Sequence, residues 1–532
     1  MSIPLRQLLI VLVLSMAAGC SVFRPTEEEL PLSKSIIPLP ASVDWGKGVY
    51  KLPTDNRICY NEEAEEAALW MQELLKQTST NVSLAQGNSC GNINLVRTEA
   101  LRSEVGEEGY LLEIDQAGIS IRSGTEAGLF YGIQSLRQLF PPAIESSVVE
   151  KEILLPFVDL RDQPHFSWRG TMVDVARSFF GLDYLKRHVD RMALYKLNRL
   201  HLHLSDDQGW RLEIKGKPRL TEVGSKGAVK GGNSGFLTQA EYKELQDYAL
   251  ARNITIIPEI DMPGHIYAAL VAYPELNCEG FTNLTPARAT PPELFREYNV
   301  GWSKFCLDKP EVYDFVSEVL KEVASITKGP WIHIGGDEIK DPRYREFVVR
   351  ADSIVRSLGK TSIGWEEVTQ AEVDESLISQ RWRGTVEGVV DVKVIHSLCS
   401  QFYFDHGNIP GQENTNNWCK KDGVSLKNAY SFDDYAPNVI GVEAPVWTEF
   451  VLDQHMLDNR FWPRTLAVAE IGWTPPDMRN FQDFLLRTGA QGGRLGEMGI
   501  HFFLTPEIQW SATEVEANPT GVFAGFLPET KR

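Results

Sequence analysis

Short apolar runs alternate with longer amphipathic stretches from about residue 167 onward. In the longer stretches apolar positions recur every three to four residues, as in a helix with one buried face, whereas the short runs suit buried strands. The expected strands are 170–174, 199–204, 254–260, 331–334, 361–365, 377–382, 401–404 and 439–446. The expected helices between them include 182–197, 239–252, 310–327 and 344–358. This alternation predicts an α/β fold, a (β/α)8 TIM barrel that becomes irregular where the later crossovers are short.

The N-terminal part of the chain shows a different pattern. Residues 62–76 and 128–140 place apolar side chains on one helical face, and 109–122 alternates as a hairpin with Gly118 at its turn. These elements predict a small α+β domain that precedes the barrel. We therefore expect a supporting α+β domain over 36–160, a catalytic barrel over 161–510 and a C-terminal tail over 511–532.

The first twenty residues indicate export. Arg6 precedes a short apolar run at 8–16, which is too short to span a bilayer as a helix, and the run ends in Ala-Ala-Gly-Cys. Small residues before Cys20 resemble a bacterial lipobox, in which the cysteine is acylated; a plain secretory signal is the alternative. We expect a lipid-anchored protein of the bacterial cell envelope, in the outer membrane or periplasm, with a tether over 21–35.

Charge narrows the range of partners. The chain has 53 Lys and Arg against 72 Asp and Glu, a formal net charge of -19. An acidic surface does not compensate phosphate charge, so no nucleic acid is expected, and electrostatic docking on anionic lipids is disfavoured. Membrane contact is therefore expected only through the N-terminal lipid anchor.

The cysteines fit an oxidising compartment. There are seven, and without Cys20 an even number remains, which favours disulfides in an exported protein. No CxxC motif is present, so no zinc or redox centre is expected. Pairs that are neighbours in the sequence are Cys59 with Cys90, Cys278 with Cys306 and Cys399 with Cys419, but other connectivities stay open.

Polar and aromatic side chains gather directly after the expected strands. Catalytic residues of TIM barrels lie at this end of the strands. In strand order these residues are Asp174 and Arg177; Asp206 and Asp207; Glu259, Asp261 and His265; Asp337 and Glu338; Trp365 and Glu366; Trp382; Asp405; and Trp447 and Glu449. This register predicts one site at one end of the barrel.

The central motif is HIGGDE at 333–338. Its two glycines permit a tight turn or the close approach of a ligand. Side chains of adjacent residues diverge, so we expect that Asp337 and Glu338 do not flank one scissile bond as a nucleophile and an acid, which would need a spacing of ~5–5.5 Å. A plain helix N-terminus, where acidic residues are favourable, is the alternative interpretation.

HIGGDE resembles the signature of family 20 glycoside hydrolases, the β-N-acetylhexosaminidases. Four more stretches match that family in the same order: RGTMVDVAR at 169–177, NRLHLHLSDDQGWR at 198–211, IPEIDMPGH at 257–265 and VEAPVWTE at 442–449. The resemblance runs from near Tyr110 to about Phe503. It implies an exo-acting enzyme, without a cofactor, that removes terminal non-reducing β-linked GlcNAc from oligosaccharides. The mechanism it implies is retaining and substrate-assisted, through an oxazolinium intermediate.

The resemblance also implies a role for each matched residue. Asp337 would orient the 2-acetamido group, Glu338 would be the general acid and base, and Tyr403 would donate a hydrogen bond to the acetamido oxygen. The implied substrate-binding residues are Trp365, Trp382 and Trp447 around the acetamido group, Arg177, Asp405 and Glu449 at sugar hydroxyls, and Asp206 with His265 as a relay behind Glu338.

Several points stay open. Ser178 stands where many relatives have histidine, and 279–300 and 385–396 match poorly and are interpreted as rim loops. His201, His203 and His333 are interpreted as structural, although the first two beside Asp206 and Asp207 could indicate a metal-dependent hydrolase instead. A non-catalytic sugar-binding lipoprotein and a two-carboxylate glycosidase are further alternatives. Linkage, aglycone, tolerance of GalNAc, natural substrate and oligomeric state are not determined by the sequence.

Overall fold

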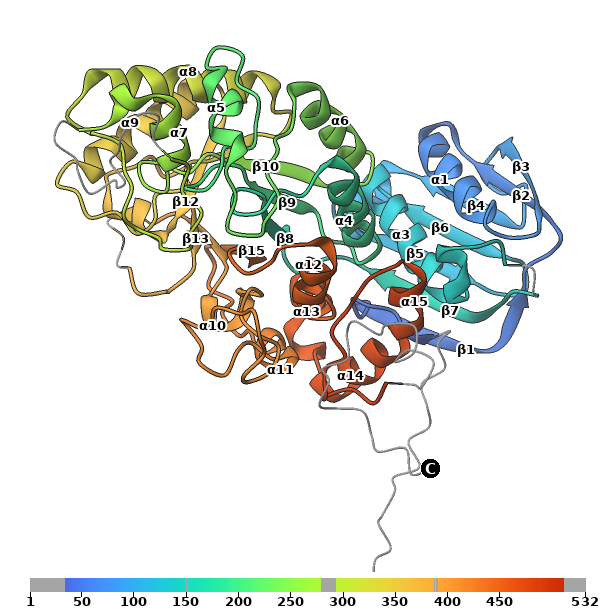
Figure 1. Cartoon of the computed structure of the whole chain (residues 1–532). Helices are drawn as coiled ribbons and strands as arrows, with labels where there is room; N and C mark the ends of the chain where they lie inside the picture. Colours follow the sequence, from blue (N-terminus) through green and yellow to red (C-terminus); the bar gives the residue numbers. More distant parts are fainter. Residues whose placement is uncertain (1–33, 150–151, 279–292, 387, 389–390, 511–532) are drawn as a thin grey trace, which may run out of the picture.

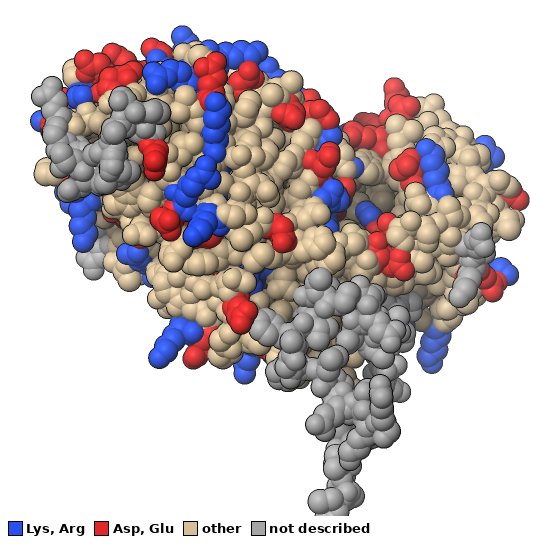
Figure 2. Space-filling view, in the orientation of Figure 1, with Lys and Arg blue, Asp and Glu red and all other residues tan. Residues whose placement is uncertain are grey.

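The computed structural model describes residues 34–149, 152–278, 293–386, 388 and 391–510, and Figure 1 shows an N-terminal α+β domain beside a larger barrel domain. The predicted signal peptide with Cys20, most of the tether and the C-terminal tail lie outside the described residues. None of the described helices is both long enough and apolar enough to cross a membrane. On the face seen in Figure 2, basic and acidic side chains are interspersed over both domains.

The N-terminal domain is built on a mixed seven-stranded sheet in the order β1-β7-β5-β6-β4-β2-β3. The predicted hairpin is confirmed: β5 and β6 are antiparallel, and Gly118 between them has a positive φ of 139°. The predicted helices are also confirmed as α1 and α3, which pack on the sheet and on each other. The bounds are β1 Ser42–Lys51, β2 Asp55–Tyr60, α1 Glu65–Leu75, β3 Asn81–Gln86, β4 Ile93–Arg97, α2 Arg102–Val105, β5 Tyr110–Ile114, β6 Ile119–Ser123, α3 Glu126–Leu139 and β7 Leu154–Asp162.

Eight parallel strands close the predicted barrel in the order β8-β9-β10-β11-β12-β13-β14-β15 and back to β8. The strands are β8 Trp168–Asp174, β9 Arg199–His203, β10 Thr255–Glu259, β11 Trp331–His333, β12 Thr361–Trp365, β13 Ile378–Arg381, β14 Lys393–His396 and β15 Val439–Val446. The helices are α4 Leu182–Leu194, α5 Arg219–Glu222, α6 Gln239–Leu250, α7 Tyr267–Ala272, α8 Pro310–Ile326, α9 Tyr344–Ser357, α10 Cys399–Phe402, α11 Leu426–Tyr430, α12 Gln454–Phe461, α13 Arg464–Trp473, α14 Phe481–Ala490 and α15 Gly492–Glu497.

The seventh strand was wrongly placed from the sequence. Residues 401–404 were predicted as that strand because an aromatic-rich run has a high β propensity. The Phe402 amide instead donates to the Leu398 carbonyl at 2.7 Å, which closes a helical turn in α10. The strand is β14, within the stretch that had been interpreted as a rim loop. The predicted irregularity is confirmed, because only the 3-10 helix Glu366–Gln370 lies between β12 and β13.

The barrel interior has an apolar layer with polar residues above it. Trp168, Ile257, Ile363, Ile378 and Ile395 form a separate buried cluster, one residue from each of five strands. Strand side chains alternate between the two faces, so residues two positions further along these strands point into the same interior. Glu259 and Trp365 stand there, toward the C-terminal end of the barrel. The polar residues of the site therefore lie directly above a packed layer of branched and aromatic side chains.

Buried charge pairs join the two domains. Arg169 of β8 donates to both carboxylate oxygens of Glu108, at 3.0 and 2.7 Å, and Lys196 pairs with Asp162 of β7 at 2.9 Å. These contacts lie near the N-terminal ends of the first barrel strands, opposite the catalytic end. The N-terminal domain therefore contacts the barrel at the end opposite the catalytic one.

All three disulfides between sequence neighbours are confirmed: Cys59–Cys90, Cys278–Cys306 and Cys399–Cys419. The last of them ties α10 to the loop that precedes α11. That loop and α10 form part of the connection between β14 and β15, on the catalytic side of the barrel.

Candidate active site

The site residues predicted from the sequence gather at the C-terminal end of the barrel. Most of them end a strand or follow one: Arg177 after β8, Asp206 after β9, His265 after β10, Asp337 and Glu338 after β11, Trp365 at the end of β12, Trp382 after β13, and Trp447 and Glu449 after β15. Tyr403 and Asp405 differ from the prediction, since they follow the helical turn α10 and not a strand.

The turn after β11 has an unusual backbone. Gly335 and Gly336 have φ of 68° and 99°, and Glu338 itself has φ of 59°, in the left-handed region. A side chain at Gly335 would collide with the Asp261 carboxylate, so only glycine fits there. A left-handed non-glycine residue costs on the order of 1–3 kcal/mol and persists where surrounding contacts hold it, often at functional sites.

This turn brings the two adjacent carboxylates together. The Nε2 atom of His265 lies 3.6 Å from Asp337 Oδ2 and 3.7 Å from Glu338 Oε2. The expected divergence of the two side chains holds for an extended strand but is wrong here, because the left-handed residue turns Glu338 back toward its neighbour. Asp337 and Glu338 therefore face one shared region.

His265 lies between these carboxylates and a third. Its Nδ1 is 3.7 Å from Asp206 Oδ1, and its own φ is 52°. Burial opposes its charged form, but the carboxylates of Asp337 and Asp206 raise the pKa of His265 well above its ordinary value. His265 is thus a cation that links Asp206 to the acid pair.

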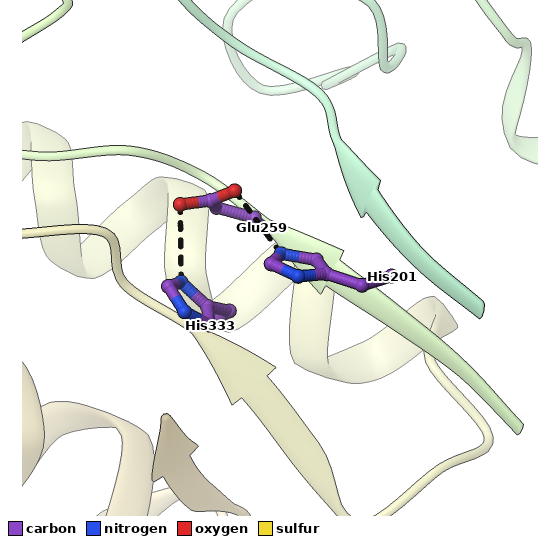
Figure 3. A group of neighbouring side chains, drawn as sticks. All are labelled: His201, Glu259 and His333. Carbon is purple, nitrogen blue, oxygen red and sulfur yellow. Dashed lines mark ion pairs between the residues drawn. The ribbon is translucent and has the colours of Figure 1, made fainter. Parts of the chain in front are cut away.

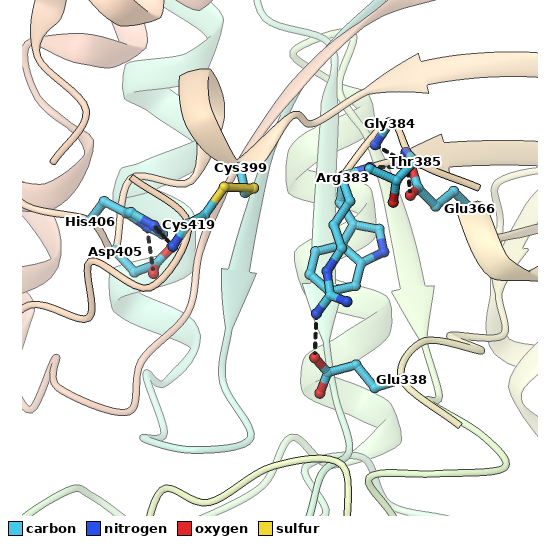
Figure 4. Close-up of a disulfide and its surroundings, with 10 residues drawn as sticks. Glu338, Glu366, Arg383, Gly384, Thr385, Cys399, Asp405, His406 and Cys419 are labelled. Atoms are coloured by element: carbon cyan, nitrogen blue, oxygen red, sulfur yellow. Dashed lines mark hydrogen bonds and ion pairs between the residues drawn. A yellow bond between two sulfur atoms is a disulfide. The ribbon is translucent and has the colours of Figure 1, made fainter. Parts of the chain in front are cut away.

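The pKa of Glu338 is raised above the ordinary glutamate value. Burial is the largest cause and the negative charge of Asp337 the next, while His265 and Arg383 pull the pKa of Glu338 down. Arg383 Nη2 donates to Glu338 Oε1 at 2.9 Å, and Figure 4 shows the guanidinium reaching toward that carboxylate. A raised pKa favours the protonated carboxyl, which is the form that a general acid needs before it transfers its proton.

Arg177 is the second arginine of the site and is firmly paired. Its Nη2 lies 2.7 Å from Asp206 Oδ2, and its guanidinium lies 4.9 Å from the ring centroid of Trp447. Burial opposes the ionised form of Asp206, but Arg177 and His265 hold the pKa of Asp206 below its usual range. Burial raises the pKa of Glu449 to about 7; Arg177 opposes this, and Asp174 and Asp405 add to it.

Four aromatic side chains form one continuous wall. Trp365 and Trp447 lie 5.7 Å apart, Trp382 stacks on Tyr403 at 6.1 Å with 12° between the rings, and Tyr403 is 6.1 Å from Trp447. The Trp382 indole N–H donates to Glu367 Oε2 at 3.0 Å. The pKa of Tyr403 is raised well above its ordinary value by burial, and by Asp337 next. Tyr403 is therefore a neutral hydrogen-bond donor near the acid pair.

Glu259 is the hub of a buried polar network beneath this wall. It accepts hydrogen bonds from His203 Nδ1 at 2.6 Å and from the Trp365 indole N–H at 2.9 Å. Figure 3 shows that His201 and His333 approach its two carboxylate oxygens, at 3.0 and 3.1 Å.

The same network continues upward to the site. His203 Nε2 lies 2.9 Å from Asp206 Oδ2, so the chain of contacts leads from Glu259 through His203 to Asp206 and the relay. Burial opposes the charged form of His201, but Glu443 and Glu259 raise the pKa of His201 to about 9. The network holds Trp365 through Glu259 and Asp206 through His203.

Two neighbouring strands therefore supply groups that the metal-dependent alternative had lacked: Glu259 and His333 stand beside His201. The donor set does not favour that alternative. The nitrogen–oxygen distances of 2.6–3.1 Å around Glu259 are those of hydrogen bonds and ion pairs. They are shorter than the roughly 3.3 Å that separates two ligand atoms of a tetrahedral zinc ion. Each carboxylate oxygen of Glu259 already faces two nitrogen atoms.

Comparison with known sequences identifies the family. The family model "Glycosyl hydrolase family 20, catalytic domain" matches residues 166–347 and 342–476, and "Glycosyl hydrolase family 20, domain 2" matches 33–162. The chain belongs to glycoside hydrolase family 20. It is accordingly a glycoside hydrolase of the β-N-acetylhexosaminidase class, as the resemblance had indicated.

Relatives of family 20 cover nearly all of the described chain. A "Beta-N-acetylhexosaminidase" of Cellulomonas fimi is 31% identical over 499 residues, which span 90% of this chain and 97% of that one. A "Beta-hexosaminidase" of Porphyromonas gingivalis is 33% identical over 515 residues, 88% of this chain, but the match spans only 64% of that longer protein. The solved Streptomyces plicatus N-acetyl-beta-hexosaminidase in complex with Thio-NAglucal is 37% identical, with a TM-score of 0.83 over 91% of this chain and 98% of that one.

Three further residues of this family 20 site were not predicted from the sequence. Arg383 pairs with Glu338, Glu367 holds Trp382, and Trp418 lies 5.6 Å from Trp382. No motif covers them. Arg383 directly follows Trp382, and Glu367 follows the predicted rim residue Glu366, so position in the chain was the only available signal.

Proposed function

We propose that this family 20 enzyme removes terminal β-linked GlcNAc from the non-reducing end of oligosaccharides, with the substrate's own acetamido oxygen as nucleophile. The observation that carries the proposal is the convergence of Asp337 and Glu338 on one nitrogen of His265. Two carboxylates on one side of a bond cannot act as a nucleophile and an acid from opposite faces. They can divide the work between the acetamido group and the leaving oxygen.

In the first step the acetamido oxygen attacks C1 of the sugar, and the bond from C1 to the leaving oxygen breaks. Glu338 gives its proton to that oxygen. Asp337 accepts a hydrogen bond from the acetamido N–H and balances the positive charge of the oxazolinium ion, and Tyr403 donates to the acetamido oxygen. The raised pKa of Glu338 suits this step, because the acid must be protonated when substrate binds.

In the second step a water molecule attacks C1, and Glu338 takes one of its protons. The bond from C1 to the acetamido oxygen breaks, so the acetamido group is restored and the β-configuration is retained after two inversions. Asp206 and His265 act as positioning residues behind the acid pair, since His265 is within 3.7 Å of all three carboxylates.

The remaining predicted residues fit a pocket that encloses one terminal sugar. Trp365, Trp382 and Trp447 would enclose the acetamido methyl group and offer apolar faces to the ring. Arg177, Asp405 and Glu449 would bind hydroxyls, and a hydrogen bond to a charged group contributes about 1.5–3 kcal/mol. Enclosure of the non-reducing end would limit cleavage to the last sugar of a chain, which is exo action.

The test uses an aryl β-N-acetylglucosaminide and follows the anomeric configuration of released GlcNAc by proton NMR. We expect the β-anomer to appear first, and we expect a thiazoline analogue of the oxazolinium ion to inhibit competitively. Initial release of the α-anomer would contradict the proposal. So would a covalent glycosyl–carboxylate adduct trapped with a 2-fluoro sugar, which would indicate a two-carboxylate glycosidase.

We also propose that the enzyme is anchored to the bacterial envelope through an acylated Cys20. Arg6, the apolar run at 8–16 and Gly19 before Cys20 support this, and three disulfides fit an oxidising compartment. Metabolic labelling with radioactive palmitate in a bacterial host tests it. The wild-type protein should be labelled and should partition with membranes, and Cys20→Ser should lose both properties. Equal labelling of the two proteins would contradict acylation at this residue.

A further inference from the structure

Arg383 lies beside Glu338, the proposed acid of the reaction. It is the second residue after β13, and its Nη2 donates to the carboxylate of Glu338 at 2.9 Å (Figure 4). Its guanidinium lies 4.0 Å from the ring centroid of Trp382 and 5.5 Å from that of Trp418. The Arg383 side chain is 42% exposed and Trp418 is 46% exposed. The arginine therefore reaches from the solvent side of the pocket wall to the acid.

The backbone beneath Arg383 is held firmly. The carboxylate of Glu366 accepts the amide N–H groups of Trp382 at 3.2 Å, of Gly384 at 2.8 Å and of Thr385 at 3.3 Å, as Figure 4 shows in part. Gly384 has a positive φ of 70°, which lets the chain turn directly after the arginine. The half-exposed guanidinium can therefore change partners while its backbone stays in place.

The pairing of Arg383 with Glu338 opposes the reaction. Glu338 has to carry a proton before it can protonate the leaving oxygen, and a guanidinium at hydrogen-bond distance favours the ionised carboxylate. Something in the substrate complex must therefore draw Arg383 away from Glu338. The sugar bonded to the leaving oxygen is the group that comes within reach, because that oxygen contacts Glu338 itself.

Neighbouring charges decide what kind of leaving sugar fits. Asp337 and Glu367 place carboxyl groups on this side of the site, so an anionic substituent needs a cation of its own. Among the described site residues the other arginine, Arg177, is already paired with Asp206 at 2.7 Å. The other cation, His265, is buried between Asp206, Asp337 and Glu338, so the half-exposed Arg383 is the cation that such a substituent would meet.

We propose that Arg383 and Trp418 form a subsite for a leaving sugar that carries a carboxylate, a proposal that rests on the hydrolysis proposed above. The carboxylate of the sugar pairs with Arg383 and releases Glu338 to hold its proton, while the exposed Trp418 ring offers an apolar face to the same sugar. Uronic acids and the lactyl ether of muramic acid both supply this carboxylate.

The experiment compares two disaccharides with the same linkage, GlcNAc β-linked to glucuronate and GlcNAc β-linked to glucose. They differ only in the carboxylate and leave through the same kind of oxygen. We expect wild-type kcat/KM to be roughly tenfold higher for the acidic disaccharide, as a charge-assisted hydrogen bond at a half-exposed site would give. Arg383→Gln should bring the ratio near one, and Arg383→Lys should retain part of it. In a third disaccharide GlcNAc is β-linked to muramate. Its kcat/KM, compared with that of the glucuronate disaccharide, shows which of the two carboxylates Arg383 prefers.

A second readout separates this role from a merely structural one. Arg383 lowers the pKa of Glu338, so Arg383→Gln should move the basic limb of the pH profile on the neutral disaccharide to higher pH. Trp418→Ala should lower kcat/KM for both disaccharides and leave their ratio unchanged. Equal wild-type values for the two disaccharides, or a preference that survives Arg383→Gln, would overturn the proposal. Failure to hydrolyse any GlcNAc substrate, aryl glycosides included, would instead contradict the hydrolysis on which it rests.

Discussion

Replacement of Glu338 by glutamine separates protonation of the leaving group from every other part of catalysis. Glutamine has nearly the same shape and can still accept the hydrogen bond from Arg383, but it has no proton to transfer. General acid catalysis contributes about 10²–10⁴-fold, which corresponds to about 3–5 kcal/mol of the activation barrier. We therefore expect kcat/KM to fall by about 10²–10⁴-fold on a disaccharide, whose leaving alkoxide needs the proton. On a dinitrophenyl glycoside, which leaves readily as an anion, the loss should be much smaller.

The exposure of Glu338 and its partner also limits how much Glu338→Gln can lower the free energy of unfolding. The Glu338 side chain is 22% exposed and its partner Arg383 is 42% exposed, and exposed ion pairs contribute about 0–1 kcal/mol. The free energy of unfolding, measured by urea titration, should fall by no more than that. The assay is a series of aryl glycosides with increasingly basic leaving groups, in which the variant should show a steeper dependence on leaving-group pKa than the wild type. An equal loss for all leaving groups would refute the assignment of Glu338 as the acid.

Three further changes test other parts of the site. Asp337→Asn should lower kcat by a similar factor with good and poor leaving groups, because it acts on the nucleophile; it should also move the basic limb of kcat/KM to lower pH, since the Asp337 charge raises the pKa of Glu338. A steeper leaving-group dependence would argue against this role. Tyr403→Phe should lower kcat more mildly, also with no preference between leaving groups, and an unchanged kcat would exclude a contact with the acetamido oxygen. Glu259→Gln should lower the free energy of unfolding, measured in urea, by about 3–5 kcal/mol, because it removes the buried charge that neighbouring histidines face. It should also raise KM, because Trp365 loses the acceptor of its indole N–H. A free energy of unfolding within about 1 kcal/mol of the wild-type value would contradict the central role of Glu259 in the buried network.

Much of the fold was predictable because it depends on local patterns. Seven of the eight barrel strands and the principal helices follow from runs of apolar residues and their period. β14 could not be predicted, because only Val394 and Ile395 of its four residues are apolar, while the nearby aromatic run of α10 gave the stronger strand signal. The closed barrel supplies the hydrogen bonds that so short a strand needs from its neighbours β13 and β15.

The site was predictable as a set of residues but not as a geometry. Motifs and strand ends pointed to Asp337 and Glu338, yet their convergence depends on the left-handed backbone of Glu338, which no residue pattern predicts. The hub at Glu259 depends on the register of three neighbouring strands, which brings His201 and His333 to its two oxygens. Arg383 reaches Glu338 from the turn after β13, 45 positions further along the chain, and such a long-range contact leaves no local signal in the sequence.

The most direct test of the account uses aryl glycosides whose 2-acetamido group carries zero, one, two or three fluorine atoms. Fluorine withdraws electrons from the acetamido oxygen and weakens it as a nucleophile, but it hardly changes the size of the group. If that oxygen attacks C1, kcat/KM should fall steeply with each fluorine, and the corresponding 2-hydroxy glucoside should be hydrolysed far more slowly than any of them. A rate that does not depend on fluorination would mean that the nucleophile belongs to the protein or to water, and the division of labour between Asp337 and Glu338 would be wrong.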